Sequence, residues 1–505
     1  MEITPERANE IMEEATTKAA ELLSTKPKIA EIILKQLLKV DPEHYNGLSL
    51  LGLTKHRLGK NAEAVEIIQT TIELDPQDAD NYNTLGLAYA GLGKHERAIE
   101  SIKKAIELNP SQHLFLNNLA LQYRIVRDYP KAIATLEHAI SLFPDSANMW
   151  SNLGGIHGEL KDIQKAMKCF QEALEIDPYF APAHVDLAFA HHLLGEWQAG
   201  FKHYDWRFEY FEQMKYYLNA FDQRKRWNGK DSLEGKKILI YAEQGLGDCI
   251  QFMRFLPLLN CDVTVHCPPT LNRVVSRFAT PFNCDIVDNP NIVLPEHDYQ
   301  CAIMSLPYLL NIHDFSGKPY ISSNSNFRSV LEKDYPAKLR IGLVWAGSPA
   351  HPHDQKRSIP LKHFREICSL PNVRVFSLQF DMRPRKYGFD MRPCAEGKVI
   401  DFAEGCEDMK LVDLTTVIQD MEDTVNILAG LDLVIACDTS IVHLAGAIGI
   451  PCFLLLPYNC DWRWCVSGDK TVWYDSVELF RQPDRDDWST PISAIKAKLE
   501  TLLQN

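Results

Sequence analysis

The hydrophobic pattern of the first two-fifths of the chain repeats every 34 residues. Small residues recur in the phrases LSLLGLTK, YNTLGLAY, LNNLALQY and WSNLGGIH, at Gly52, Gly86, Ala120 and Gly154. Two further offsets keep the same step, at Ala64, Ala98, Ala132 and Ala166 and at Pro76, Pro110, Pro144 and Pro178. Small residues let two helices approach closely, and proline ends a helix because it has no N–H for the hydrogen-bond ladder. The pattern therefore predicts a solenoid of helical hairpins.

Two degenerate units flank these four. The segment that ends at Pro42 reads as a first half-unit, and residues 183–208 read as a fifth unit with Gly200 where alanine is expected. Atypical end repeats are expected because they cover the open ends of a solenoid core. The spacing and the small residues resemble the tetratricopeptide repeat. The resemblance implies a concave surface that binds a peptide or protein, with a purely structural array and homodimerisation as the alternatives.

After Trp227-Asn228-Gly229 the pattern changes to short apolar runs separated by helical segments. The predicted strands are 236–242, 262–267, 284–287, 299–305, 339–347, 373–379, 411–415, 432–437 and 452–457. Helices are expected at 361–369, 423–431 and 491–504. This alternation predicts two α/β units with parallel sheets, in which ligands lie at the carboxyl ends of the strands. The expected domains are residues 1–210, 211–335 and 336–505.

Composition narrows the classes of partner. The chain has 505 residues, a hydrophobic fraction of 46% and a net charge of −14, which disfavours nucleic acid and anionic lipid. The first residues carry no signal-peptide pattern, and no apolar run reaches the length of a membrane span. The 13 cysteines include no C-x-x-C pair. We therefore expect reduced thiols and a cytoplasmic location.

The first candidate site follows the strand at 236–242. Gly245 and Gly247 form half of a dinucleotide fingerprint, but Ile250 takes the third glycine position, which disfavours an NAD site. Asp248 then begins a helix. It reads equally as a helix N-cap and as a carboxylate that takes a proton from an attacking hydroxyl.

The second candidate site follows the strand at 339–347. Ser348, Lys356 and Arg357 lie in one loop, where basic side chains suit phosphate. A metal site formed by His351, His353 and Asp354 is less expected than a solvated loop. At the end of the next strand, Gln379 reads as a contact to a base, ribose or phosphate, or as a strand-terminal polar residue.

The third candidate site is DTSIVHLAGAIGIP, residues 438–451. Asp438, Thr439 and Ser440 lie between a strand and a helix, so free N–H groups and a positive dipole end favour an anion. His443 lies one turn further and reads as a core residue or a phosphate contact. In the loop at 458–464, Asp461, Trp462 and Arg463 form a packing segment or a substrate-stacking surface.

Residues 236–482 resemble bacterial GT-B glycosyltransferases related to the ADP-heptose lipopolysaccharide heptosyltransferases. The matching motifs are GLGD (245–248), the loop at 345–361 and the segment at 432–451. With the repeats in front, the organisation is similar to that of O-GlcNAc transferases and of repeat-containing flagellin glycosyltransferases. The resemblance implies two Rossmann-like lobes with a cleft between them, a nucleotide-sugar co-substrate, no metal or other cofactor, and inversion at the sugar.

The resemblance also assigns roles. Asp248 becomes the general base, and Arg357 or Lys356 the contact to the donor diphosphate. The donor side includes Ser348, Gln379, Asp438, Thr439, Ser440 and His443, and the substrate side Gly245, Gly247, Gln251, Asp461, Trp462 and Arg463. The expected acceptor is a protein, flagellin among the candidates. Two alternatives stay open, a glycan- or lipid-directed heptosyltransferase-like enzyme and a non-catalytic nucleotide-binding scaffold. The metal-motif match DRD (484–486) is discounted because it follows the strands in a polar tail.

Overall fold

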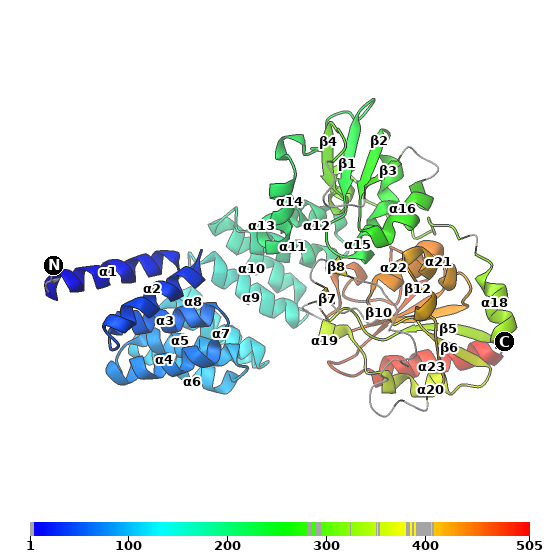
Figure 1. Cartoon of the computed structure of the whole chain (residues 1–505). Helices are drawn as coiled ribbons and strands as arrows, with labels where there is room; N and C mark the ends of the chain where they lie inside the picture. Colours follow the sequence, from blue (N-terminus) through cyan, green and yellow to red (C-terminus); the bar gives the residue numbers. More distant parts are fainter. Residues whose placement is uncertain are drawn as a thin grey trace. The chain divides into compact units, whose positions relative to one another are not determined.

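The computed structural model describes residues 5–279, 284–287, 294–323, 325–349, 351, 354–379, 384–385, 388–389, 406 and 409–504. The chain divides into two compact units, Met1–Asp186 and Leu187–Asn505. Figure 1 shows the element labels used below. Among the described residues, no helix is long and apolar enough to cross a membrane.

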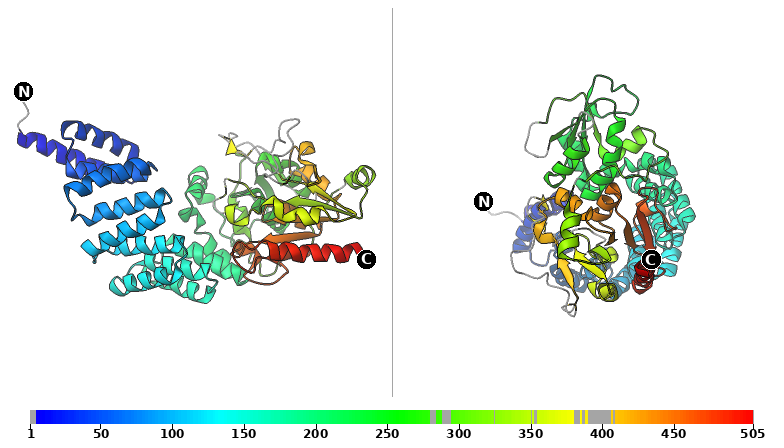
Figure 2. Two further views of the ribbon diagram at one scale, coloured as in Figure 1. Left: turned by 90° about the horizontal axis from the view of Figure 1, so that it is seen from below. Right: turned by 90° about the vertical axis from the view of Figure 1, so that its right-hand side faces the viewer.

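The first unit is a stack of helical hairpins, seen along its length in Figure 2, left. Its helices are α1 Pro5–Leu22, α2 Pro27–Val40, α3 Tyr45–Arg57, α4 Asn61–Leu74, α5 Ala79–Gly91, α6 His95–Leu108, α7 His113–Ile125, α8 Tyr129–Leu142, α9 Ala147–Glu159 and α10 Ile163–Ile176. The predicted 34-residue register is confirmed from α3 to α10. The first unit of the repeat is a full hairpin, α1 and α2, rather than the predicted half-unit.

Close helix packing explains the small residues of the repeat. A Cβ on Gly86 would lie 2.5 Å from Ile102, and one on Gly154 would lie 2.5 Å from Phe170. Real side chains do not approach so closely, so a larger residue would separate the two helices of the hairpin. The second helix of each hairpin ends two residues before its proline, as at Leu108 and Pro110.

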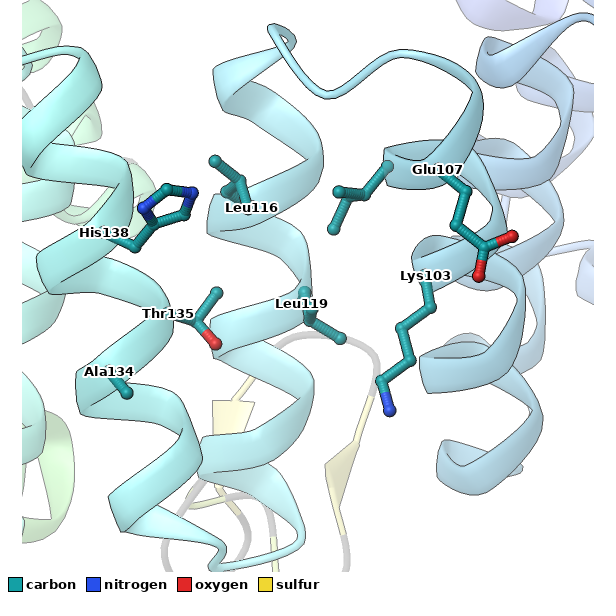
Figure 3. Close-up of a pocket in the computed structure, with 8 residues that line it drawn as sticks. Lys103, Glu107, Leu116, Leu119, Ala134, Thr135 and His138 are labelled. Carbon is teal, nitrogen blue, oxygen red and sulfur yellow. The ribbon is translucent and has the colours of Figure 1, made fainter.

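Asparagines link the first helices of neighbouring hairpins. Asn118 Nδ2 donates to Asn83 Oδ1 (2.9 Å), and Asn152 Nδ2 donates to Asn117 Oδ1 (2.7 Å). A groove of about 430 Å³ lies between α6, α7 and α8 (Figure 3). Its lining combines apolar and charged side chains, including Leu116, Leu119, Lys103, Glu107 and His138.

Most of the fifth repeat belongs to the second unit. Its helices are α11 Ala181–Leu193 and α12 Trp197–Tyr204, which keep the 34-residue register. Trp197, Phe201 and Tyr204 are buried in the same apolar cluster as both α/β lobes. A Cβ on Gly200 would overlap the ring of His192, which explains the missing alanine.

The first sheet has four parallel strands in the order β3-β2-β1-β4. They are β1 Lys237–Tyr241, β2 Asp262–His266, β3 Cys284–Val287 and β4 Tyr299–Ala302. The helices around them are α13 Arg207–Tyr210, α14 Lys215–Ala220, α15 Leu246–Phe252, α16 Asn272–Ala279 and α17 Leu306–Leu309. Phe208, Met214 and Phe221 pack on Leu239 and Tyr241 of β1, so the segment before the sheet covers one of its faces.

The second sheet has six parallel strands in the order β12-β11-β10-β5-β6-β9. They are β5 Leu339–Val344, β6 Val373–Ser377, β9 Leu411–Asp413, β10 Leu433–Cys437, β11 Cys452–Leu456 and β12 Val477–Arg481. A separate antiparallel pair is formed by β7 Pro384–Arg385 and β8 Gly388–Phe389. The predicted parallel α/β arrangement is confirmed, and β12 is a strand that the sequence reading missed.

The helices that accompany the second sheet are α18 Phe327–Asp334, α19 Asp354–Arg357, α20 Arg365–Cys368, α21 Met421–Leu428, α22 Ser440–Ile448 and α23 Ser489–Gln504 (Figure 1). Short 3-10 turns in this unit are η1 Glu212–Met214, η2 Gln223–Lys225, η3 Met253–Leu258, η4 Pro269–Leu271, η5 Ile303–Ser305, η6 Leu361–Phe364, η7 Thr415–Val417 and η8 Trp462–Trp464. Buried residues of both sheets belong to one continuous apolar cluster, which fixes the two lobes against each other.

Candidate functional site

Two strand-to-helix turns meet between the lobes. One leads from β1 into α15 and carries GLGD, and the other leads from β10 into α22 and carries Asp438-Thr439-Ser440. A Cβ on Gly247 would lie 2.7 Å from His443 Cδ2 and 3.4 Å from Ser440 Cα. Gly247 therefore serves the close approach of the two helices, and the chain brings both predicted motifs to one place.

The first turn satisfies its own helix end. α15 begins at Leu246 with Gly245 as N-cap, so Asp248 is the third helical residue and not the N-cap that one reading of the sequence expected. Asp248 Oδ2 accepts a hydrogen bond from Gly245 N at 2.7 Å. This contact is one half of a capping box, since Gly245 has no side chain to supply the other half, and the negative charge of the carboxylate suits the positive end of the helix dipole.

Arg463 bridges the two lobes. Its guanidinium forms an ion pair with Asp248 Oδ1 and donates to Gln251 Oε1 and Asp461 Oδ1, both at 2.8 Å. It is 7% exposed and lies 4.1 Å from the centre of the Trp462 ring. Three of the predicted substrate-side residues are therefore partners or neighbours of one buried arginine.

The carboxyl groups around Arg463 have shifted pKa values. Burial raises the pKa of Asp248, and the charge of Arg463 opposes that rise. Burial and the nearby Asp461 raise the pKa of Asp438 to about 6, against the opposing charges of Arg357 and Arg463. Carboxyl groups whose pKa values are raised by burial and by nearby charges are common at functional sites.

The second turn leaves its helix end open. Thr439 is the N-cap of α22 with extended backbone (φ −143°, ψ 171°), but its side chain makes no capping hydrogen bond. Among the described residues, Thr439 Oγ1 and Ser348 Oγ are buried without a hydrogen-bond partner. The two residues follow β10 and β5, which are neighbouring strands. Buried hydroxyls without partners are costly, so the arrangement favours a ligand at this edge.

Arg357 lies beside this open turn. Its Nη1 donates to the carbonyl oxygen of Asp438 (2.9 Å) and its Nε to Asp354 Oδ1 (3.1 Å). A Cβ on Gly347 would lie 2.5 Å from Arg357 Nη2, so a larger residue would displace the guanidinium from its present position. Lys356 is exposed and makes none of these contacts.

The side chain of Gln379 is hydrogen-bonded to the backbone of the loop after β5. Its Oε1 accepts from the backbone N–H of Trp345 (3.1 Å) and Ala346 (2.9 Å), and its Nε2 donates to Ala346 O (3.0 Å). These contacts fit the strand-terminal reading of Gln379. No group of three His, Cys, Asp or Glu side chains that could hold a metal ion occurs in the described part of the chain. His353 lies outside the described residues.

His443 and Trp462 are packing residues in this structure. His443 is buried, its Nδ1 lies 3.0 Å from Tyr474 Oη, and its ring stacks on Trp464 at 5.5 Å. Burial and the charges of Arg463 and Arg254 lower its pKa well below the usual value, so the ring is neutral. Trp462 is buried against His192, with ring centres 4.3 Å apart.

Sequence reasoning missed the residues that support the first turn from behind. Tyr204 and Arg207 contact Gln244 and Glu243, which directly precede GLGD. Arg254 of the first lobe donates to Trp473 O at 2.8 Å in the second. The contacts join residues 36 to 219 positions apart, and the only local hint was the charged and polar pair Glu243-Gln244 between a buried strand and two glycines.

Comparison with known proteins identifies the helical region. Residues 45–78, 79–112 and 147–180 match the tetratricopeptide repeat. This region is a tetratricopeptide-repeat solenoid. A thermophilic TPR protein of Thermus thermophilus is similar at 24% identity, covering 35% of this chain and 98% of that chain, with a TM-score of 0.33. A MamA protein is similar at 28% identity, covering 33% and 93%, with a TM-score of 0.28.

A relative also extends into the second unit. Protein FlbA of Caulobacter vibrioides is 25% identical over 308 residues, which cover 54% of this chain and 48% of that protein. The chain therefore matches about half the length of this relative. The Cut9 and Hcn1 heterotetramer is a further similar structure, at 22% identity, with 38% of each chain covered and a TM-score of 0.35.

Proposed function

We propose that the chain is a GT-B glycosyltransferase that transfers a sugar from a nucleotide-sugar to a hydroxyl of a protein recruited by the repeats. The observation that carries the proposal is the open helix end at Thr439, with two unpartnered hydroxyls and Arg357 beside it and Asp248 on the helix packed against it. A helix N-terminus with nearby arginine is a suitable site for a diphosphate.

On the donor side, the residues around α22 would hold the leaving group. The first N–H groups of α22, the hydroxyls of Thr439 and Ser348, and the guanidinium of Arg357 would take up the negative charge that develops on the nucleoside diphosphate. The proposal includes no metal ion, as the resemblance implies.

On the acceptor side, Asp248 would act as general base. The acceptor oxygen attacks the anomeric carbon, the bond from that carbon to the phosphate oxygen breaks, and the hydroxyl proton passes to Asp248. The ion pair of Arg463 with Oδ1 favours the ionised carboxylate and opposes the rise in the pKa of Asp248 that burial causes. The resemblance implies inversion at the sugar.

The repeats would recruit the acceptor. Tetratricopeptide repeats bind protein partners. The asparagines on α5, α7 and α9 form a row in which Asn152 is partly exposed, and an amide side chain can both donate to and accept from a peptide backbone. Replacing Asn117 and Asn152 by alanine should weaken transfer to protein and leave cleavage of the nucleotide-sugar by water unchanged.

One observation favours a second candidate, a nucleotide-binding scaffold without catalysis. Both carboxylate oxygens of Asp248 are occupied, Oδ1 by Arg463 and Oδ2 by the Gly245 amide. Each oxygen keeps a second lone pair that could accept a proton, but both contacts favour the ionised form and oppose protonation, which suits a purely structural aspartate.

The experiment compares Asp248→Asn with the wild-type chain. Asparagine can still accept from Gly245 N, so we expect normal folding and normal binding of a nucleoside diphosphate, with release of that diphosphate from a nucleotide-sugar slowed at least about 100-fold. The control is Asp469→Asn, an exposed aspartate of the same unit. Binding without turnover in the wild type would favour the scaffold, and equal turnover in both chains would show that Asp248 is not the general base.

A further inference from the structure

Residues of the fifth repeat contact the two residues that precede the first turn, Glu243 and Gln244. We propose that Tyr204 and Arg207 are positioning residues that fix Gln244 and Glu243, and through them the backbone that aims Asp248. The kinetic part of this proposal rests on the proposed function, and its structural part does not.

Tyr204 holds a strained residue. Gln244 has a φ of +68°, a left-handed conformation that costs free energy for any residue other than glycine. Its side-chain amide meets the Tyr204 hydroxyl twice, with Nε2 donating at 2.8 Å and Oε1 accepting at 3.2 Å. The anchored side chain therefore keeps the backbone in a conformation that it would otherwise leave.

Arg207 holds the neighbouring residue. Arg207 and Glu243 are both fully buried, and Arg207 Nη2 donates to Glu243 Oε1 at 2.6 Å. The same guanidinium donates to Asp205 Oδ1 (2.8 Å) and to Ser305 Oγ (2.9 Å). Because several groups bind the Arg207 guanidinium at once, its position is restricted, and its ion pair restricts the position of Glu243 as well.

Tyr204 is itself immobilised by packing. It is 2% exposed, and its ring lies 5.8 Å from Phe189 and 5.9 Å from Trp462, with the Arg207 guanidinium 5.0 Å from its centre. Trp462 also contacts Arg463, which pairs with Asp248. The residues of the fifth repeat thus support the turn at Gln244 and at Asp248 together.

The turn has a specific need for this support. Asp248 is three residues beyond Gly245, and the two glycines of the motif give the backbone conformational freedom. A displacement of about 1 Å in a catalytic group can reduce the rate about 100-fold. Anchors placed directly before the glycines limit that displacement, so the last repeat acts as part of the candidate active site.

The test uses four variants of the full chain. Tyr204→Phe removes the hydroxyl and keeps the packed ring. Gln244 is exposed, so its side chain can be changed without opening the core. Gln244→Ala removes the amide that bonds to Tyr204 but leaves a residue for which a positive φ is strained. Gln244→Gly removes the amide and the strain together. Tyr216→Phe, at a tyrosine that is 61% exposed, is the matched control.

The first measurement is amide hydrogen exchange. We expect exchange in residues 244–248 to be about fivefold faster in Tyr204→Phe and Gln244→Ala, less affected in Gln244→Gly, and unchanged in the control. Exchange in α22 should stay as in the wild type. Equal exchange of the turn in all chains would overturn the proposal, whether or not the protein transfers sugar.

The second measurement is steady-state transfer. We expect kcat to fall about tenfold in Tyr204→Phe and Gln244→Ala at an unchanged KM for the nucleotide-sugar, with Gln244→Gly closer to the wild type. A residue that only stabilises the fold would not produce this order of the two Gln244 variants, so equal loss in both contradicts positioning. If the wild type transfers no sugar, the proposed function fails, and the exchange result alone decides the positioning role.

Discussion

The two turns at the candidate site have the same architecture but differ in the hydrogen bonds at the start of their helices. Each follows a buried parallel strand and begins a short helix, and the two helices pack against each other. In the first turn the side chain of Asp248 closes the helix end and pairs with Arg463. In the second turn Thr439 leaves the helix end uncapped, and its hydroxyl is buried without a partner among the described residues.

The difference separates two tasks. A turn that satisfies its own amides delivers a carboxylate at a fixed place, which suits proton transfer. A turn that leaves its amides open suits an anion that supplies the missing acceptors. Under the proposed function, the same strand–turn–helix unit would serve acceptor chemistry at one sheet and donor binding at the other. Three substitutions test how the two turns are built.

The largest effect is expected from removing the bridge between the turns. Arg463→Ala leaves Asp248 and Asp461 without their buried counter-charge, which we expect to cost about 3–5 kcal/mol of unfolding free energy. Denaturant unfolding measures the loss. Arg224→Ala is the control, because Arg224 pairs with Asp222 on the exposed surface, where loss of an ion pair has little effect on stability. Equal losses in the two variants would show that Arg463 does not join the turns energetically.

A smaller loss of stability is expected from a larger side chain between α15 and α22. A methyl group at residue 247 would meet the buried ring of His443, so Gly247→Ala should cost about 1–3 kcal/mol. Gly158→Ala in α9 is the control, because its new methyl group meets only Ala166 Cβ at 4.0 Å and alanine favours a helix. If Gly247→Ala is as stable as the wild type, the turns do not pack as described.

The smallest expected effect is a dependence of the free energy of unfolding on pH, caused by Asp438 in the second turn. The folded pKa of Asp438 is about 6, above the usual 3.8, so ionised Asp438 opposes folding above pH 6. That penalty disappears as the pH falls through about 6 toward about 4, the span between the folded and the unfolded pKa. Asp438→Asn should therefore be more stable than the wild type at about pH 7.5, by a margin that narrows at about pH 4.5. A margin independent of pH, measured by denaturant unfolding, would contradict the raised pKa.

The features that the sequence predicted are those that depend on neighbours along the chain. The 34-residue step and the buried strands leave periodic patterns of small and apolar residues, and both were found where expected. The motifs at Asp248 and Thr439 were recognised because glycines and hydroxyl residues directly follow strands.

The features that the sequence missed depend on contacts across the fold. Arg207 meets Glu243 and Arg463 meets Asp248 across 36 and 215 residues, and no local pattern marks such pairs. His443 illustrates the limit, because its surroundings within the helix do not distinguish a core residue from a ligand contact. Its packing against Gly247 and its hydrogen bond to Tyr474 do so only once the lobes are together.

The most direct test of the account is the binding of nucleoside diphosphates to the full chain, measured as a shift in Tm. A ligand at about 100 times its Kd stabilises the folded state by about 2.7 kcal/mol, which gives a readily measured shift. We predict that at least one nucleoside diphosphate raises the Tm of the wild type and of Asp248→Asn, and that Arg357→Ala loses the shift. If no nucleoside diphosphate raises the Tm of the wild type, the open turn at Thr439 is not a donor site and the account is wrong.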